Sequence, residues 1–274
     1  MSPDLPTCKT LLLSREGARL TITLNDPATK NALSPAMREE LTAVLDSAGN
    51  DDTLRVLILT GANGVFCAGG NIGNFKESIA SDAPAGAPDP IAQSNRVFGD
   101  LMTKLNALPK VVIAVIEGPA YGGGFGLACA ADIAIAKADA KFALSETTLG
   151  LVPAQIAPFV VGRIGLSQAR RLALSGARIG AEEAYRIGLV HYLSDDSTAL
   201  AVTLNEVLDA VGRCGINAIA ATKEVLLATL EQPLAAVLDR AAILFAQQMR
   251  GPEGREGVAA FLEKRPASWV DKTE

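Results

Sequence analysis

The chain has 274 residues, of which 49% are hydrophobic and 20% are charged, and its formal net charge at pH 7 is −5. This composition is typical of a globular protein that buries a full core, as one domain with an appendage or as two small domains. The acidic balance, without any basic cluster, argues against a nucleic-acid-binding protein.

Neither a secretory segment nor a membrane span is expected. Residues 1–17 lack a cationic start followed by a long apolar stretch. The most apolar region, residues 111–136, is interrupted by Glu117, Asp132 and several glycines, which argues against a membrane span. The four cysteines form no C-x-x-C pair, so we expect reduced thiols, no metal site and a cytoplasmic protein.

The N-terminal part predicts a hairpin followed by a helix. Apolar and polar residues alternate over 19–24, which is typical of a half-buried strand, and residues 9–15 are predicted to pair with it across Glu16-Gly17. Ser34 is a predicted N-cap with Pro35 at the first helical position, so an amphipathic helix should run to about Ala48.

The next region combines a short strand, a glycine loop and a polar segment. Residues 54–60 predict a strand, and residues 61–73 a glycine-rich loop. Residues 78–90 are rich in Ala, Pro, Asp and Ser and cannot bury much apolar area, so we expect a mobile flap there. A helix is predicted over residues 91–107.

The stretch from Glu117 to Ala131 is the most informative part of the chain. It follows a β-branched run at 111–116, contains three consecutive glycines at 122–124, and continues into an apolar segment of helical length. A strand, a glycine turn and a helix in this order direct the free N–H groups of the helix start toward an anion. The alternative is a tight turn packed for its own sake. No dinucleotide or P-loop motif is present.

The remaining core is predicted to alternate short strands with helices. Strands are expected at 132–136, 141–144 and 189–193, and helices at 154–163, 167–175 and 181–187. From residue 197 onward only helices are expected, at 197–213, 216–230, 233–250 and 253–263. We therefore predict an α/β core over residues 1–195 and a helical region over 196–274.

The single histidine, His191, gives no support to a nucleophilic triad. It lies in the apolar phrase G-L-V-H-Y-L, where a strand or edge position is the expected role, and no G-x-S-x-G motif accompanies it.

The two glycine loops offer a different chemistry. Each leaves a strand and enters a helix, so each can present one N–H to the same oxygen. Such an oxyanion-hole donor stabilises a developing anion by about 3–4 kcal/mol.

Four motifs carry a resemblance to a known family. C-A-G-G-N-I at 67–72, G-P-A-Y-G-G-G-F-G-L-A at 118–128, F-A-L-S-E-T-T-L-G-L-V-P at 142–153 and F-L-E-K-R at 261–265 resemble the enoyl-CoA hydratase/isomerase (crotonase) family. The resemblance spans about residues 10–270 and keeps the order and spacing of the motifs. It implies a spiral of ββα units with a C-terminal helical trimerisation region, packed as a homotrimer or a dimer of trimers.

The resemblance also implies the ligand and its contacts. The substrate would be an acyl-CoA, with no cofactor besides the coenzyme A of the substrate, and the amides of Gly70 and Gly123 would hold its thioester oxygen. The nucleotide end would be lined by Lys30, Ala32, Ala68 and Ile72, and Phe261 and Lys264 would reach a neighbouring subunit's coenzyme A. Without the resemblance, both lysines are read as solvated charges.

The catalytic carboxylates depart from the family pattern. Classical hydratases of this family use two glutamates, and their positions match Gly126 and Glu146. Glu146 lies in a mostly apolar phrase, which raises a carboxylate's pKa toward the range useful for proton transfer. The alternative for Glu146 is a surface or helix-capping residue. The usual proline-glycine stretch reads P-A-Q-I-A-P here and introduces Gln155, and Asn71 stands where the family usually has Asp.

Gly126 is expected to leave extra room for a branched or carboxylated acyl chain, with Gly126 and Gln155 lining it. The phrases around both residues are similar to bacterial hydratases of methylglutaconyl-CoA and, more so, of isohexenylglutaconyl-CoA. The sequence thus predicts a lyase that adds water across the α,β double bond of an enoyl-CoA. Two alternatives stay open, a Δ3,Δ2-enoyl-CoA isomerase and a non-catalytic CoA-binding paralogue.

Overall fold

The computed structural model describes residues 5–71, 73, 76, 86 and 89–270. Ile72 and most of the segment predicted as a mobile flap, residues 78–90, lie outside the described residues. Among the described helices, none is both long enough and apolar enough to cross a membrane.

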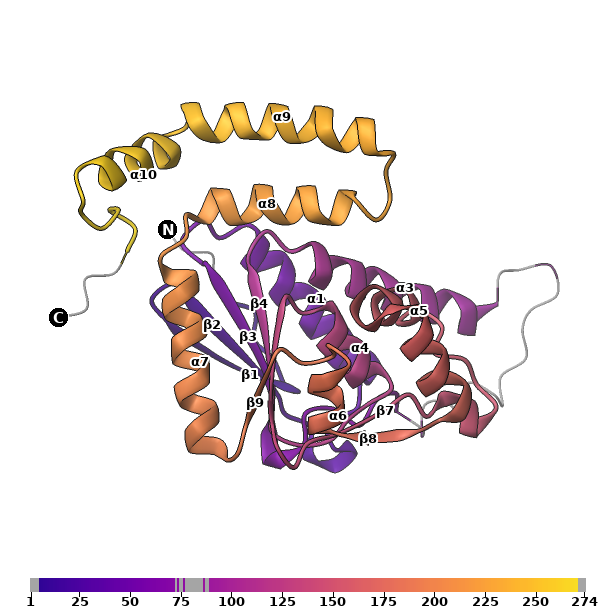
Figure 1. The fold of residues 1–274 in the computed structure, drawn as a ribbon. Coiled ribbons are helices and arrows are strands. Elements are labelled where there is room, and N and C mark those ends of the chain that lie inside the picture. The colour runs from indigo at the N-terminus through magenta and orange to yellow at the C-terminus, as the bar shows by residue number, and fades with distance from the viewer. Residues whose placement is uncertain (1–4, 72, 74–75, 77–85, 87–88, 271–274) are drawn as a thin grey trace.

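A six-stranded sheet forms the centre of the molecule, in the order β1-β2-β3-β4-β6-β9 (Figure 1). The first two strands pair antiparallel and the following pairs are parallel. The strands are β1 Leu11–Glu16, β2 Arg19–Leu24, β3 Val56–Gly61, β4 Val111–Ile116, β6 Ile133–Lys137 and β9 Tyr192–Ser194. The inner strands β3, β4 and β6 are mostly buried and rich in Val, Ile and Ala, as expected where both faces of a parallel sheet are covered.

A second, three-stranded sheet lies at the end of the molecule where the glycine turn is found. It consists of β5 Ala120–Tyr121, β7 Lys141–Ala143 and β8 Arg178–Gly180, in the order β5-β7-β8. The sequence predicted β7 but neither β5 nor β8. Strands of two and three residues are too short to show a period of alternation.

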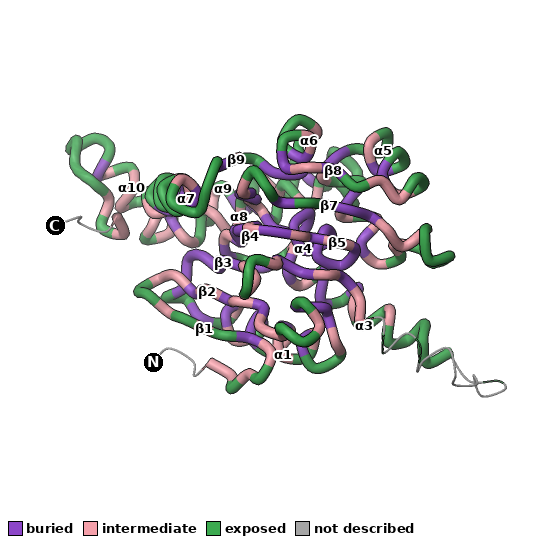
Figure 2. Tube along the Cα trace, turned by 90° about the horizontal axis from the view of Figure 1, so that it is seen from below, coloured by how far each residue is buried: buried purple, intermediate pink, exposed green. Residues whose placement is uncertain are grey.

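One face of the large sheet is covered by helices α1 Pro35–Gly49, α3 Pro90–Ala107, α4 Gly123–Ala130 and α5 Ala157–Ser175. Every residue of α4 is buried, so this helix forms the centre of that layer (Figures 1 and 2). Helix α5 was predicted as two helices. Gly165 breaks its helical geometry with φ of +70°, which agrees with that prediction of an interruption. Helix α6, Ala181–Arg186, follows β8.

Helix α7, Ser197–Gly212, covers the opposite face of the sheet. Its residues Leu200, Val207 and Leu208 share one apolar cluster with residues of the central strands, among them Ile113 and Ile135. Packing therefore does not separate α7 from the core, although residue 195 was the predicted boundary. The division into a core and an oligomerisation region remains a proposal.

Helices α8 Ile216–Ala228, α9 Leu234–Arg250 and α10 Pro252–Leu262 form a C-terminal arm. Figure 1 shows α8 lying across one end of the core, whereas α9 and α10 extend beyond that end. An ion pair fixes the arm: Lys223 Nζ on α8 lies 2.8 Å from Asp132 Oδ2, which also accepts a hydrogen bond from the Val112 amide at 2.7 Å.

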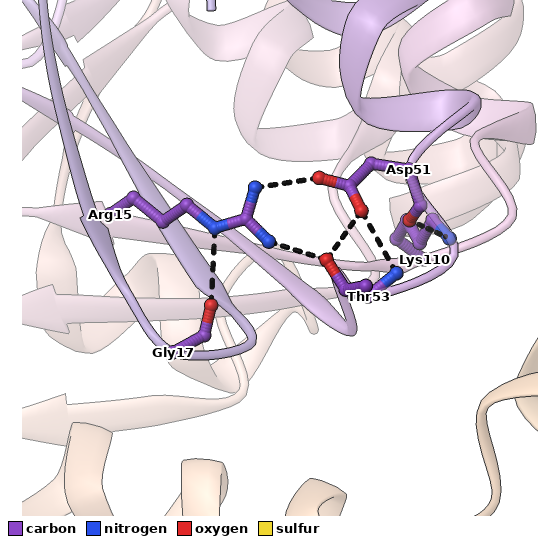
Figure 3. Close-up of polar contacts among 5 residues, drawn as sticks. All are labelled: Arg15, Gly17, Asp51, Thr53 and Lys110. Carbon is purple, nitrogen blue, oxygen red and sulfur yellow. Dashed lines mark hydrogen bonds and ion pairs between the residues drawn. The ribbon is translucent and has the colours of Figure 1, made fainter. Parts of the chain in front are cut away.

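Polar contacts connect the strand ends on the side near the arm (Figure 3). Arg15 donates to Asp51 Oδ2 at 2.6 Å and to the carbonyl of Gly17 at 3.2 Å, and Thr53 donates to Asp51 Oδ1. Lys110 Nζ donates to the Asp51 carbonyl at 2.8 Å. These bonds link β1, the loop before β3 and the start of β4, and they hold the sheet end opposite the glycine turn.

Candidate active site

Two glycine loops lie side by side at the carboxyl ends of β3 and β4. The Cys67 amide donates to the Pro119 carbonyl at 3.0 Å, and the Tyr121 amide donates to the Cys67 carbonyl at 2.9 Å. Cys67 and Ala120 thus form an isolated parallel bridge. Because parallel strands end at the same edge of the sheet, the two loops that carry Gly70 and Gly123 meet there.

Glycine is required at two positions in these loops. Gly69 has φ of +96° and Gly122 has φ of +49°, a region that side-chain-bearing residues rarely adopt. A Cβ on Gly69 would also lie 2.9 Å from the Tyr121 carbonyl oxygen, and one on Gly122 would lie 3.7 Å from the Gly69 Cα. The two main chains therefore approach each other more closely than side chains would permit.

The amides of Gly70 and Gly123 are both available for a ligand. Gly123 is the first residue of α4, so its N–H precedes the intrahelical bonds and lies at the positive end of the helix dipole. The peptide unit that carries the Gly70 N–H is held by a bridge to Leu33, whose amide donates to the Gly69 carbonyl at 2.8 Å. Within the described part of the chain, neither of the two amides has a hydrogen-bond acceptor.

Glu146 lies directly beside these loops. It opens the 3-10 helix Glu146–Leu149 after β7, and its Oε1 lies 2.9 Å from the position that a Cβ of Gly122 would take. Its Oε2 is buried and has no hydrogen-bond partner among the described residues. Burial raises the pKa of the Glu146 carboxyl, although a bond from its own backbone amide opposes the shift. A half-buried carboxylate with one unpartnered oxygen, next to the loops that carry these two amides, is suited to proton transfer.

The expected room beside Gly126 is filled, which corrects the sequence-based interpretation. A Cβ on Gly126 would overlap Ile156 Cγ2 and would lie 2.8 Å from Ile156 Cβ and 3.5 Å from Met102 Cε. Ile156 therefore occupies the position where a longer side chain at 126 would lie. An aliphatic group thus lies beside Gly126, the position that matches the first glutamate of classical hydratases, so the immediate surroundings of Gly126 are apolar.

Gln155 lies against helix α3. Its Nε2 donates to Asn95 Oδ1 at 3.0 Å, and its Cδ lies 2.9 Å from the position of a Cβ on Gly99. The consecutive residues Gln155 and Ile156 thus each lie over a glycine, Gly99 on α3 and Gly126 on α4. This arrangement fixes the segment before α5 to both helices.

Three of the residues predicted for the nucleotide end lie close to the glycine loops. The Ala68 amide donates to the Lys30 carbonyl at 3.1 Å, and Ala32 is buried two residues further on. Lys30 is exposed and adopts φ of +57°. The side chain of Asn31 holds this turn through bonds to the carbonyls of Ala62 and Val65 at 3.1 and 2.7 Å.

Phe261 and Lys264 are not brought to the site within one chain. Both are exposed, at and just beyond the end of α10, with Phe261 82% exposed. Figures 1 and 2 both show α10 at the end of the molecule away from β7, and Figure 2 shows β5 beside β7. Their predicted contact with a neighbouring subunit's coenzyme A remains a proposal.

Sequence reasoning missed three side chains that border the site. A Cβ on Gly123 would lie 2.6 Å from Leu33 Cδ1 and 3.5 Å from Phe98 Cζ, and Ile156 was not singled out. The sequence did contain an indication for Ile156. Both Gly126 and the stretch P-A-Q-I-A-P, which contains Ile156, differ from the usual family pattern. Leu33 and Phe98 had no comparable signal.

The other candidate chemistries find no support among the described residues. His191 Nδ1 accepts a hydrogen bond from the Ala134 amide at 3.0 Å just before β9, and its Nε2 lies 2.8 Å from Arg163 Nη1. Burial raises the pKa of the Cys67 and Cys129 thiols to about 12. No group of three or more potential metal ligands from His, Cys, Asp and Glu is found in the described ranges.

Comparison with known proteins identifies the fold and then the family. The structure of Pseudomonas aeruginosa AtuE is similar to this chain with a TM-score of 0.92 and 50% identity, covering 96% of this chain and 100% of the other. The fold is the crotonase-like α/β fold, as predicted. The family model for enoyl-CoA hydratase/isomerase matches residues 15–272. The chain therefore belongs to the enoyl-CoA hydratase/isomerase family.

Two relatives from Escherichia coli K12 differ in the reaction that their names give. The chain is 33% identical to 1,2-epoxyphenylacetyl-CoA isomerase, covering 92% of this chain and 95% of the relative. It is 32% identical to 2,3-dehydroadipyl-CoA hydratase, covering 93% of this chain and 96% of the relative. Since the two identities are nearly equal, the choice between reactions rests on the site.

Proposed function

We propose that the chain hydrates the α,β double bond of an enoyl-CoA, with Glu146 as the acid–base group and the amides of Gly70 and Gly123 as an oxyanion hole. The observation that carries this proposal is the half-buried Glu146 carboxyl, with its buried Oε2, beside two loops whose Gly70 and Gly123 amides have no acceptor among the described residues. Its raised pKa favours a group that both takes up and returns a proton.

In the proposed reaction one carboxyl does both proton transfers. The Glu146 carboxylate removes a proton from water as the water oxygen bonds to C3, and the electron pair of the double bond moves to the thioester oxygen. The two amides stabilise this enolate. The protonated Glu146 then returns its proton to C2, so that one water is added and the residue is regenerated. No cofactor beyond the coenzyme A of the substrate is needed.

A second candidate is a Δ3,Δ2-enoyl-CoA isomerase, and the position of Ile156 favours it. Isomerisation needs one base to move a proton from C2 to C4 through a dienolate, and no water. Since Ile156 takes the place of a second carboxylate beside Gly126, Glu146 is the one acid–base group that the described residues bring to the glycine loops, and the opposite wall is apolar. Both reactions share the same oxyanion and the same Glu146.

The substrate that we propose is a carboxylated, glutaconyl-type enoyl-CoA. The support is the similarity of G-G-G-F-G and L-V-P-A-Q-I-A-P-F-V-V to hydratases of such thioesters. The relative named 2,3-dehydroadipyl-CoA hydratase also has a carboxylated acyl chain in its named substrate. Space beside Gly126 gives no support, because Ile156 fills it.

The proposal is tested by incubating the protein with a panel of straight, branched and carboxylated enoyl-CoAs in ¹⁸O-labelled water. Hydration predicts loss of the enoyl ultraviolet absorbance and ¹⁸O in the product, whereas isomerisation of 3-enoyl-CoAs incorporates none. Thermal stabilisation by acyl-CoAs without turnover of any member would instead indicate the non-catalytic paralogue. A Glu146→Gln variant that turned over every substrate as fast as the wild-type protein would contradict the assignment of Glu146 as the base.

We also propose that the arm, residues 216–262, assembles the chain into a homotrimer or a dimer of trimers. The arm exposes many large apolar side chains, and an apolar surface of this kind usually marks an interface between proteins. They are Leu226, Leu230, Leu234, Leu238, Ile243, Phe245, Met249, Val258, Phe261 and Leu262. In such an assembly Phe261 and Lys264 would contact the coenzyme A of a neighbour, with Lys264 near its phosphates. Light scattering gives the mass, and a monomer at working concentration would contradict the proposal.

A further inference from the structure

Arg38 on α1 is a half-buried cation that forms no ion pair with a carboxylate of the described residues. Its Nη1 and Nη2 donate to the carbonyl and hydroxyl oxygens of Ser94 on α3, at 3.2 and 3.4 Å. Its Nε is buried and has no acceptor among the described residues. No carboxylate of the described chain forms an ion pair with this guanidinium.

Two other partly buried cations are paired with carboxylates, whereas Arg55 and Arg163 donate to backbone carbonyls as Arg38 does. Arg15 pairs with Asp51 at 2.6 Å and Lys223 pairs with Asp132 at 2.8 Å. Burial lowers the pKa of Arg38, opposed in part by the neighbouring Glu39 carboxylate. Removing a cation from water costs free energy that pairing normally offsets. Arg38 is therefore poised to gain from an incoming anion.

Arg38 lies close to the side chains that border the proposed reaction centre. Its amide donates to the Ser34 carbonyl at 3.0 Å, directly after Leu33, whose Cδ1 lies 2.6 Å from the Cβ position of Gly123. Ser94, its partner on α3, is one turn before Phe98, and residues four apart lie on the same helix face. Phe98 Cζ lies 3.5 Å from that same Cβ position. The contact of the guanidinium with Ser94 is thus about one helical turn of α3 from Phe98.

We propose that Arg38 is a specificity-determining residue that binds the free carboxylate at the far end of the acyl chain. The substrates preferred at this site are then thioesters of dicarboxylic acids, an inference that rests on the proposed acyl-CoA site. The Nη1 and Nη2 atoms donate to Ser94 in an exposed setting, and a carboxylate can accept two parallel hydrogen bonds from a guanidinium. An aliphatic acyl chain offers this guanidinium no acceptor.

The test measures binding of unreactive saturated thioesters, so that it does not depend on which reaction the protein catalyses. Glutaryl-CoA and adipyl-CoA are titrated calorimetrically against their monomethyl esters, which keep the length and remove the charge. The wild-type protein should bind at least one acid about tenfold or more tightly than its ester, and Arg38→Met should reduce that preference about 10- to 100-fold, since a bond between charged groups contributes about 1.5–3 kcal/mol.

Arg96→Met is the matched control. Arg96 lies on α3 two residues from Ser94 and pairs with Asp100 at 2.5 Å on an exposed surface, so its loss should leave the preference for the acid intact. Arg38→Lys should retain part of the preference. Arg38→Gln, which keeps a donor for Ser94 without the charge, should lose it and serves if the methionine variant does not fold.

Two outcomes would overturn the role of Arg38: equal affinity of the wild-type protein for acids and esters of both lengths, or an unchanged preference in the folded Arg38→Met or Arg38→Gln variants. Preference for the acid together with no hydration of any enoyl-CoA would contradict the proposed hydration and leave the binding role in place. The two proposals therefore fail separately.

Discussion

Ile156 and Gly126 fit together as a complementary pair. A Cβ on Gly126 would overlap Ile156 Cγ2 and lie 2.8 Å from Ile156 Cβ, although the two residues belong to different helical segments. The family's classical hydratases have a glutamate at the position of Gly126, and here both the charge and the space for it are absent. The neighbouring wall is completed by Met102, 3.5 Å from the same point.

Restoring the missing carboxylate should therefore require removal of Ile156. We expect Gly126→Glu alone to lower the free energy of unfolding by at least about 1–3 kcal/mol, because the added atoms overpack a buried position. In an Ile156→Gly background the same substitution should cost much less, and the double variant should be more stable than the separate costs predict. Urea unfolding of all four proteins measures this coupling. Equal costs of Gly126→Glu in both backgrounds would show that the pair does not compete for space.

Glu146→Gln should remove the base while keeping the size of the side chain. We expect kcat to fall about 10²- to 10⁴-fold, the typical contribution of general acid–base catalysis. Because burial raises the pKa of Glu146 above 4.5, the wild-type kcat/KM should rise with pH through that raised pKa as the carboxylate forms. The remaining activity of the variant should not follow this titration. A wild-type profile that is flat across this range would contradict the role of Glu146.

The raised pKa of Glu146 also affects stability. As pH rises, the free energy of unfolding should fall while kcat/KM rises. A raised folded-state pKa means that the folded protein binds the proton more tightly than the unfolded chain does, so stability is greatest below 4.5 and falls as pH rises through the folded pKa. The Glu146→Gln variant has no carboxyl to titrate and so does not lose this stability. Its free energy of unfolding should therefore increase relative to wild type between pH 4.5 and the folded-state pKa of Glu146, and the difference should stay constant at higher pH. Unfolding midpoints at several pH values measure the difference.

Local pattern was sufficient for most of the fold. The alternation at residues 19–24 and the Ser34-Pro35 cap predicted β2 and α1 nearly to the residue, because strand period and helix capping are properties of adjacent residues. Helix α4 begins at Gly123, within the three glycines, whereas the sequence predicted the helical segment only after them, since glycines carry no apolar signal.

The site was predictable where motifs mark it and not where tertiary packing makes it. The glycine loops and Glu146 were found from motifs, whereas the contact of Ile156 with Gly126 joins residues 30 positions apart and depends on how α4 and α5 pack. Arg38 is one of several charged residues on α1. Its missing partner becomes visible only when α3 is placed beside it.

The amide of Gly123 can be removed in a controlled way, since it is the first residue of α4, where proline is compatible with a helix. Any Cβ there meets Leu33 Cδ1 at 2.6 Å, so Leu33→Ala must accompany the change. We expect Leu33→Ala/Gly123→Pro to have about 10²- to 10³-fold lower kcat than Leu33→Ala/Gly123→Ala, because only the former lacks an oxyanion donor. Circular dichroism checks the fold of both. Equal rates in two folded variants would contradict the proposed oxyanion hole.

The attachment of the arm to the core should depend on the pair of Lys223 and Asp132. Lys223 Nζ also donates to the Lys110 carbonyl at 3.2 Å, and its side chain is only 10% exposed. We expect Lys223→Met to lower the unfolding free energy by about 1–3 kcal/mol, because it removes a charge-assisted bond and leaves the Asp132 carboxylate without its cation.

Lys137→Met is the control for this prediction, since Lys137 lies 3.4 Å from Asp139, whose side chain is 71% exposed, and such pairs contribute about 0–1 kcal/mol. Asp132→Asn in the Lys223→Met background should cost less than in the wild type, because the asparagine oxygen still accepts from Val112 while no lysine is left unpaired. Urea unfolding followed by far-ultraviolet circular dichroism measures all four. If Lys223→Met and Lys137→Met had the same small effect, the ion pair would not hold α8 against the sheet, and the apolar contacts of the arm would have to do so alone.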